Sequence, residues 1–233
     1  MTQQASLDSV RQDGPAGLWQ AYLQHRYAFL FYSLILTLVI APILKAIGIH
    51  GNFMQLFLGL NLMAASVPLE SRKGRWVLPA IVLVAIVLRI TSLQTGHAGL
   101  STLSLWLWTA IGLYAVFIAL RFALRSLVIT SEHLYAALSA YLLAGVFMGV
   151  LYWSLDQVWP NSIIVNGPGA SDPFLPGEGI YFSFITLATV GYGDMVPGND
   201  VVRNLAIVEA IAGQFYLAVM IARLMSLYMN KAR

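Results

Sequence analysis

The chain has 233 residues and a formal net charge of +3, and 59% of its residues are hydrophobic while only 10% are charged. These few polar side chains cannot cover a water-facing surface, which excludes a soluble globular protein and indicates an integral membrane protein. The sequence contains no cysteine, which excludes a disulfide framework and a thiolate metal site.

Six apolar windows along the chain approach the length of a membrane helix, which needs roughly 20 apolar residues to cross a bilayer core about 30 Å thick. The predicted fold class is therefore an all-α membrane protein. We expect transmembrane helices at Phe29–Leu44, Phe53–Leu69, Trp76–Ile90, Leu103–Leu120, Leu134–Leu155 and Val201–Met225.

Residues 1–26 lack the basic region and short apolar core of a cleaved signal peptide, so we expect a retained tail. Basic residues beside a span resist crossing the membrane and set its orientation. If the tail is cytoplasmic, ten basic residues fall inside and three outside, which predicts a multi-pass protein of the cell or inner membrane with both termini in the cytoplasm. The inner set is Arg11, Arg26, Arg72, Lys73, Arg75, Arg121, Arg125, Arg223, Lys231 and Arg233; the outer set is Lys45, Arg89 and Arg203.

Short loops join the first four spans, so residues 27–126 are expected to form a four-helix transmembrane module. The fifth span carries the sequence GVFMG, from Gly145 to Gly149. Two small residues at this spacing allow another helix to approach closely.

The longest connection, Asp156–Asp200, lies between the fifth and sixth spans. Within it, Pro176 and Glu178 suit the first turn of a helix, because proline has no amide to satisfy there and a carboxylate favours the positive end of the dipole. The stretch EGIYFSFITLAT gives about three turns, too short to cross a bilayer and too apolar to lie in water. We therefore expect a re-entrant half-helix whose negative C-terminal end points into the membrane and stabilises a cation.

The sequence TVGYG follows this half-helix and must return as non-helical backbone, which is tolerated where protein surrounds it or where it lines a wet path. Gly191 and Gly193 allow backbone angles that other residues avoid. The carbonyl groups of residues 189–192 can then face one side, while the side chains of Val190 and Tyr192 pack on the other. Several chains around an axis would place rings of these oxygens about a dehydrated cation.

The segment TLATVGYGD, in this setting, resembles the signature of the tetrameric potassium channels, and the resemblance covers about the last hundred residues. The arrangement of the whole chain is similar to that of a six-transmembrane, prokaryotic-type channel subunit. The resemblance implies that carbonyl oxygens, with the Thr189 hydroxyl, replace the water shell of K⁺. The implied selectivity filter consists of Thr189, Val190, Gly191, Tyr192 and Gly193, and its first four residues form the K⁺ sites.

The resemblance also implies a homotetramer, because the chain contains one filter and no second copy. Residues 127–233 would form the pore domain, with an outer helix, a pore helix, the filter and an inner helix. K⁺ would pass down its gradient without a cofactor, and the expected partners are K⁺, the lipid bilayer and the other copies. No basic block indicates nucleic-acid binding.

Several residues around the filter match supporting positions in the family. Tyr181 and Phe182 stand where many members place an aromatic cuff against the filter tyrosine, here Tyr192. Asp194 resembles an acid tied to the pore helix, and Tyr181 is placed to supply the hydroxyl. The alternative is that Asp194 is a solvated acid at the mouth.

Some family members carry a Glu four residues before the filter threonine, where this sequence has Ile185. Glu209 is an ionisable residue at membrane depth, which by default marks a function. It either braces the pore helix or faces the cavity.

The inner helix has Gly213 where the family places a hinge, and close packing against the pore helix is the alternative. By the same resemblance, four residues face the conduction path, and the last two form an apolar constriction near the cytoplasm. They are Gln214, Leu217, Ile221 and Met225.

A voltage sensor needs several charges moving through the field, each worth about 2.3 kcal/mol per 100 mV. The fourth span contains no arginine, and Arg121 and Arg125 follow only at its end. We therefore expect a channel without strong voltage gating, whose first four helices serve assembly or an unknown stimulus. In the third span, Arg89 is either a remnant charge or an interfacial anchor.

Two alternative functions remain open. The first is a voltage-gated potassium channel, which differs in how its open probability depends on voltage. The second is a non-conducting membrane sensor subunit that binds K⁺ without passing it. No acid and histidine cluster or serine and histidine pair indicates catalysis, so an enzyme is not expected.

Overall fold

The computed structural model describes residues 25–47, 58–59, 61, 77–95, 98–125, 130–166 and 174–231. This part of the chain is mostly helical, as predicted, with one small antiparallel sheet. Its helices are α3 (Arg26–Ala46), α5 (Val77–Thr95), α6 (Ala98–Arg125), α7 (Ser131–Val158), α8 (Pro176–Leu187) and α9 (Asp200–Lys231), and its strands are β1 (Ile163–Val165) and β2 (Met195–Pro197).

Four helices of the described part are long and apolar enough to cross a membrane. Their candidate spans are Arg26–Leu44, Gly99–Arg125, Ser131–Val158 and Asp200–Arg223, and α5 adds a shorter apolar stretch, Ala80–Ser92. The predicted span Phe53–Leu69 lies outside the described residues except for Leu58, Gly59 and Asn61. The all-helical membrane fold is therefore supported, and the number of six spans stays a prediction.

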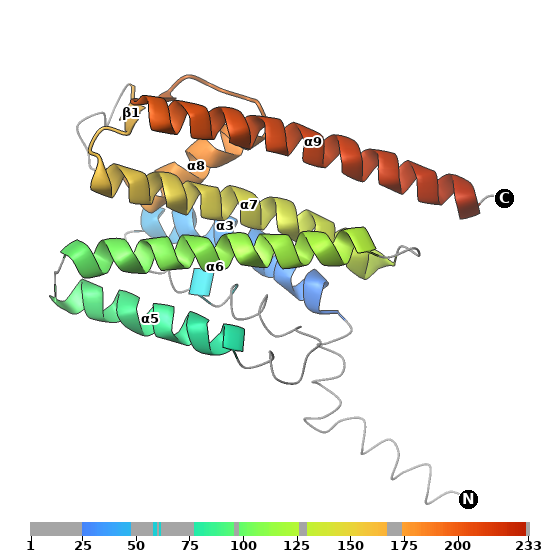
Figure 1. The fold of residues 1–233 in the computed structure, drawn as a ribbon, viewed down its shortest axis with the longest axis horizontal. Coiled ribbons are helices and arrows are strands. Elements are labelled where there is room, and N and C mark those ends of the chain that lie inside the picture. Colours follow the sequence, from blue (N-terminus) through green and yellow to red (C-terminus); the bar gives the residue numbers. More distant parts are fainter. Residues whose placement is uncertain are drawn as a thin grey trace, which may run out of the picture.

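The long helices lie side by side, in the order α5, α6, α7 and α9, with α3 packed on α7 (Figure 1). The short helix α8 contacts both α7 and α9. The start of α9, the end of α7 and the strands gather at one end of the bundle, which we call the sheet end (Figure 1). The starts of α3 and α7 lie at the opposite end.

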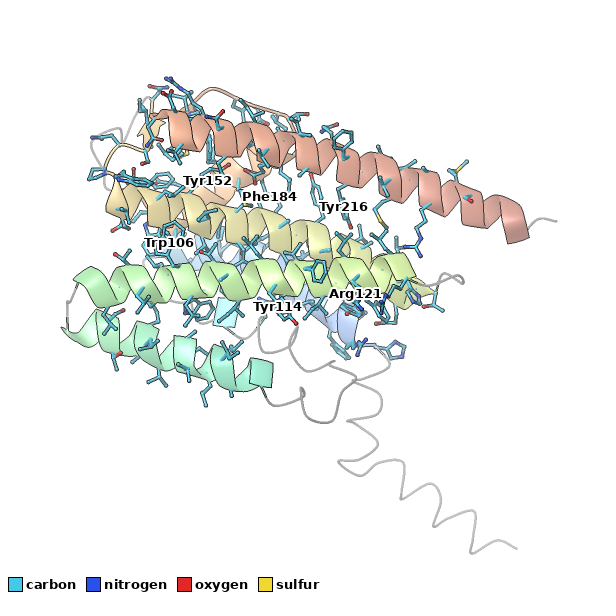
Figure 2. The ribbon with its side chains drawn as sticks, in the orientation of Figure 1. Trp106, Tyr114, Arg121, Tyr152, Phe184 and Tyr216 are labelled. Atoms are coloured by element: carbon cyan, nitrogen blue, oxygen red, sulfur yellow. The ribbon has the colours of Figure 1, made fainter. Side chains whose placement is uncertain are left out.

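Glycine residues let α8 sit directly on α7. A Cβ atom added at Gly149 would lie 2.4 Å from Cα of Ile180, and one at Gly179 would lie 2.4 Å from the Gly149 carbonyl oxygen. At Gly145 a Cβ would lie 2.6 Å from the ring of Phe184 of α8, which is labelled in Figure 2. The close approach predicted for GVFMG is therefore confirmed, and α8 is the helix that approaches.

The inner helix α9 is buried along one stripe only. Val202, Glu209, Gly213 and Met220 lie on that stripe, at spacings of one or two helical turns. Most of the remaining α9 surface is exposed and apolar in the single chain, including Phe215 at 67%. This surface faces away from the rest of the chain.

Candidate functional site

Helix α8 begins where the sequence predicts. Pro176 occupies its first turn, and the Glu178 carboxylate accepts a hydrogen bond from the Leu175 amide at 2.6 Å. This bond satisfies an amide just ahead of the helix and places negative charge at the positive end of the dipole. With 12 residues, α8 is roughly 18 Å long, well short of a bilayer core.

The backbone after α8 has an alternating conformation. Thr189, Gly191 and Gly193 have φ values of 56°, 54° and 81°, while the residues between them have no positive φ. Glycine adopts such angles easily, but a β-branched residue does so at a cost of roughly 1–3 kcal/mol. The sequence predicted this freedom at the glycines and missed the strain at Thr189. Strain of this kind concentrates at functional sites.

Helix α8 holds the first part of this loop. The Val190 and Gly191 amides both donate to the Ile185 carbonyl, at 2.8 and 3.2 Å, so the loop turns back over the end of α8. The Thr189 hydroxyl donates to the Ala188 carbonyl at 2.7 Å and accepts from the Gln214 side chain at 3.3 Å. The predicted filter and the predicted cavity residue Gln214 are thus in contact.

The loop of residues 188–194 is exposed in the single chain. All residues from 188 to 194 are exposed, with Tyr192 at 72% and Val190 at 50%. An exposed non-helical backbone is not tolerated in lipid, so at membrane depth this loop requires cover from outside the chain or a water-filled path.

The far end of the loop is anchored at two points. Tyr181 Oη donates to Asp194 Oδ2 at 2.8 Å, which is the contact predicted from the sequence. This bond to the Asp194 carboxylate raises the pKa of Tyr181 above its ordinary value. Asn166 adds a second anchor, because its amide donates to the Asp194 carbonyl at 2.7 Å and its side chain to the Gly193 carbonyl at 3.3 Å.

Asn166 is a residue that the sequence analysis missed. It directly follows β1, which pairs antiparallel with β2 so that Val165 lies opposite Met195. The β-branched run before Asn166 was a signal for a strand. Nothing in the sequence indicated that this strand pairs with β2, where Met195 lies 30 residues after Val165.

Tyr181 and Phe182, the predicted aromatic pair, have different surroundings. Phe182 is buried, with its ring 4.9 Å from that of Tyr152 in an edge-to-face arrangement, whereas Tyr181 lies at the surface beside Asp194. Within one chain Phe182 therefore packs on Tyr152. A cuff around Tyr192 stays a prediction about neighbouring copies.

Glu209 connects three helices. Its carboxylate accepts from Ser183 Oγ of α8 at 2.5 Å and from Tyr152 Oη of α7 at 2.7 Å, and the residue is only 3% exposed. Two hydroxyl donors offset the cost of burying the acid. Of the two roles considered for Glu209, the contacts support bracing of α8 and oppose a place in the cavity. Ile185, at the position of the missing family acid, is buried as well.

Gly213 lies where α9 packs closely against the end of α8. A Cβ atom there would lie 2.3 Å from the Leu187 carbonyl oxygen, so the glycine is required for packing. Hinge bending at Gly213 stays a prediction. The predicted lining residues are all exposed in the single chain, on a stripe beside the buried one; they are Gln214, Leu217, Ile221 and Met225.

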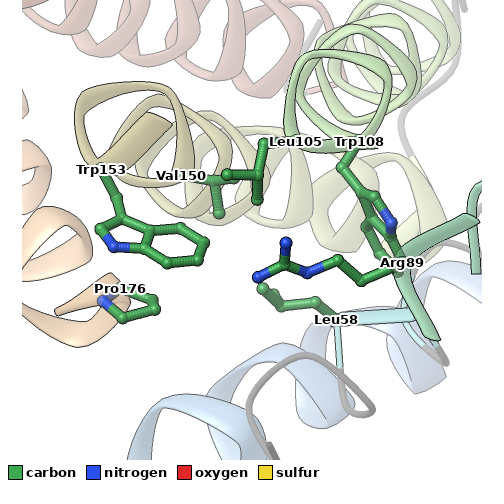
Figure 3. A pocket seen from close by; sticks show the side chains of 7 residues that line it. All are labelled: Leu58, Arg89, Leu105, Trp108, Val150, Trp153 and Pro176. Carbon is green, nitrogen blue, oxygen red and sulfur yellow. The ribbon is translucent and has the colours of Figure 1, made fainter. Parts of the chain in front are cut away.

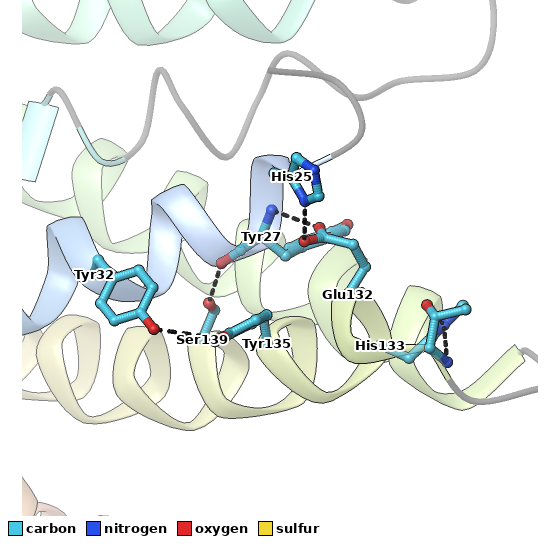
Figure 4. Close-up of polar contacts among 8 residues, drawn as sticks. His25, Tyr27, Tyr32, Glu132, His133, Tyr135 and Ser139 are labelled. Carbon is cyan, nitrogen blue, oxygen red and sulfur yellow. Dashed lines mark hydrogen bonds and ion pairs between the residues drawn. The ribbon is translucent and has the colours of Figure 1, made fainter. Parts of the chain in front are cut away.

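Polar contacts tie the helices together at the end opposite the sheet end (Figure 4). The Glu132 carboxylate of α7 accepts from the Tyr27 amide at 3.1 Å and lies 3.8 Å from His25. Arg223 of α9 donates to the Ala123 carbonyl of α6. The end of the inner helix is therefore linked to the first module.

The described residues contain no group of three or more His, Asp or Glu side chains placed to hold a metal ion. The polar residues of the site instead act on the backbone of residues 188–194. Such an arrangement positions carbonyl oxygens and contains no nucleophile paired with a base.

Comparison with known proteins gives three findings. Residues 127–230 match a family model described as ion channel. A segment of 52 residues, 19% of this chain, is 44% identical to 18% of mouse potassium channel, subfamily K, member 16. A segment of 54 residues, 23% of this chain, is 33% identical to 16% of two pore potassium channel a from Oryza sativa subsp. japonica. No solved structure matches.

The alignments span less than a fifth of the length of either relative. Together with the family match, these alignments support a relationship to the potassium channel family. They also support the prediction that the chain is a multi-pass membrane protein. Ion channels are not enzymes, so the family match confirms the prediction that the chain has no enzymatic activity.

Proposed function

From the ion channel match over residues 127–230, we propose that this protein is a potassium-selective channel that passes K⁺ passively and needs no cofactor. The K⁺ sites are the carbonyl oxygens of Thr189, Val190, Gly191 and Tyr192, with the Thr189 hydroxyl. Gly193 completes the filter. Residues 127–233 form the pore domain, residues 27–126 the first module and residues 1–26 a cytoplasmic tail.

The observation that carries this proposal is the alternation of φ from residue 189 to 193. When left-handed residues alternate with residues of negative φ, successive peptide groups can align on one side of the chain. Aligned carbonyl groups present a row of oxygen ligands, which suit a cation stripped of its water. One row of oxygen atoms from a single chain cannot enclose a cation, but four rows around a common axis form rings of oxygen atoms that can.

Exposure of the loop supports a homotetramer. Residues 188–194 and most of α9 lack cover in the single chain, and the copies would supply it for each other. In that arrangement Gln214, Leu217, Ile221 and Met225 line the path, and the last two close it by excluding water.

Supporting residues hold the filter from behind. Tyr181 and Asn166 fix its far end through Asp194, and Glu209 fixes α8 to α7 and α9. The sheet end then faces outward, and both termini are cytoplasmic.

The test is the reversal potential of purified protein in a planar bilayer with K⁺ on one side and Na⁺ on the other. We expect a value close to the potassium equilibrium potential and block by barium. A reversal potential near zero, from protein of intact fold, would contradict selectivity. Saturable K⁺ binding without current would favour the non-conducting sensor.

We predict weak voltage dependence. Helix α6 carries arginine only at its end, at Arg121 and Arg125, and none over the membrane-depth part before them. One charge crossing the whole field supplies about 2.3 kcal/mol per 100 mV, equivalent to roughly a 50-fold change in open probability. We expect a smaller change in single-channel recordings across voltage, and a steeper one would favour the voltage-gated alternative.

A further inference from the structure

Arg89 is buried inside the bundle near the sheet end. It belongs to α5 and is only 7% exposed. Its Nη1 atom donates to Ser101 Oγ of α6 at 3.1 Å, and its guanidinium carbon lies 5.4 Å from the ring centroid of Trp153 of α7. An interfacial anchor keeps its charge in water, so the contacts of Arg89 rule out the anchor role considered from the sequence.

The guanidinium lies in an apolar cavity of about 30 Å³ where four helices meet (Figure 3). In the figure it extends past Leu58 toward the indole of Trp153, and Pro176 lies on the far side of that indole. The cavity is lined by Leu58, Arg89, Leu105, Trp108, Val150, Trp153 and Pro176. Since one water needs roughly 10–15 Å³, the space is too small for an organic ligand.

Trp153 lies beside the first turn of α8, because Trp153 and Pro176 line the same cavity. Pro176 is the first residue of that helix, and a Cβ atom added at Gly179 would lie 3.4 Å from Cβ of Trp153. Trp153 therefore lies between the guanidinium of Arg89 and the start of α8.

The chemistry of arginine suits this position. Burying a guanidinium costs several kcal/mol unless hydrogen bonds and π contacts offset it. Its planar group can stack on an indole and donate to a hydroxyl at the same time, whereas a lysine ammonium is a compact point charge. An ionisable residue at membrane depth is by default functional.

We propose that Arg89 is a positioning residue for the pore helix: by holding Trp153 against Pro176 and Gly179, it lets the first module stabilise the conducting form of residues 188–194. This inference rests on the proposed channel function. It gives the module a role that requires no movement of charge across the membrane.

The test compares single-channel open probability at fixed voltage among the wild type, Arg89→Met, Arg89→Lys and Trp153→Leu, with tetramer formation checked for each. We expect Arg89→Met and Trp153→Leu each to lower open probability about 5-fold to 10-fold, with an unchanged K⁺/Na⁺ reversal potential. The double variant is expected to match either single variant, because both break the same contact. Arg89→Lys should keep the fold, and its open probability should lie between those of the wild type and Arg89→Met.

Raising K⁺ on the outer side should restore open probability in Arg89→Met, because an ion that binds the conducting filter stabilises it. A merely structural loss of fold would not respond in this way. Arg203→Met is the matched control, since Arg203 bonds to Asp200 at the exposed start of α9, and it should behave as the wild type.

Wild-type behaviour of Arg89→Met, multiplicative effects in the double variant, or an equal loss in Arg203→Met would each overturn the inference. Absence of K⁺ current from the wild type in the same bilayers would overturn the proposed function itself, and this inference with it.

Discussion

Gly191→Ala is expected to abolish the preference for K⁺ over Na⁺. Gly191 has a φ of 54°, where an added Cβ costs roughly 1–2 kcal/mol per copy, or about 4–8 kcal/mol over the four copies of the proposed homotetramer. Apart from its own chain neighbours, no described residue has an atom within 4 Å of that Cβ, so the cost is conformational. The carbonyl rows then lose their alignment, and the reversal potential in opposed K⁺ and Na⁺ should move close to zero.

Gly99→Ala is the matched control. Gly99 is a helical residue of α6, and outside its own helix backbone and chain neighbours its added Cβ also meets no atom of the described residues within 4 Å, but its φ is not positive. We expect the reversal potential of this variant to equal that of the wild type. If Gly191→Ala also kept full selectivity, the backbone conformation at this position would not determine the ion sites.

Glu209→Leu is expected to cause the second large effect. It leaves the hydroxyls of Ser183 and Tyr152 buried without their acceptor, at roughly 1–3 kcal/mol each. The thermal midpoint of the purified protein should fall by about 10 °C. Current should fall with it, because α8 loses its brace to α7 and α9.

A combined variant separates this explanation from a simple packing defect. Replacing both partners of a buried hydrogen bond by apolar groups is close to neutral, so adding Ser183→Ala and Tyr152→Phe to Glu209→Leu should recover most of the lost midpoint. Thermal melts of the three proteins decide the matter. A Glu209→Leu protein as stable as the wild type would show that the carboxylate braces nothing.

Hydropathy predicted the long apolar helices of the described residues but misplaced their ends. The predicted span Trp76–Ile90 corresponds to α5, which continues to Thr95. Polar residues beyond Ile90 are accommodated in α5, since the Thr91 and Ser92 hydroxyls donate to backbone carbonyls three or four residues earlier and are not left without a partner. An average over apolar residues does not detect such local bonds.

Signals within a few residues of each other were reliable, and contacts between distant residues were not. Pro176 and Glu178 predicted the start of α8 because a helix start depends on its own first turn. The partners of Glu209 depend on how three helices are rotated against each other, and Tyr152 lies 57 residues away. The Trp153 contact of Arg89 depends on tertiary packing in the same way.

The most direct measurement is an experimental structure of the purified protein with thallium in place of K⁺, in which anomalous scattering locates the ions. We predict several thallium positions in line on an axis shared by four chains, each between oxygen atoms of residues 189–192. Carbonyl groups of residues 189–192 turned away from a common axis, or chains that do not meet around one, would contradict the channel proposal.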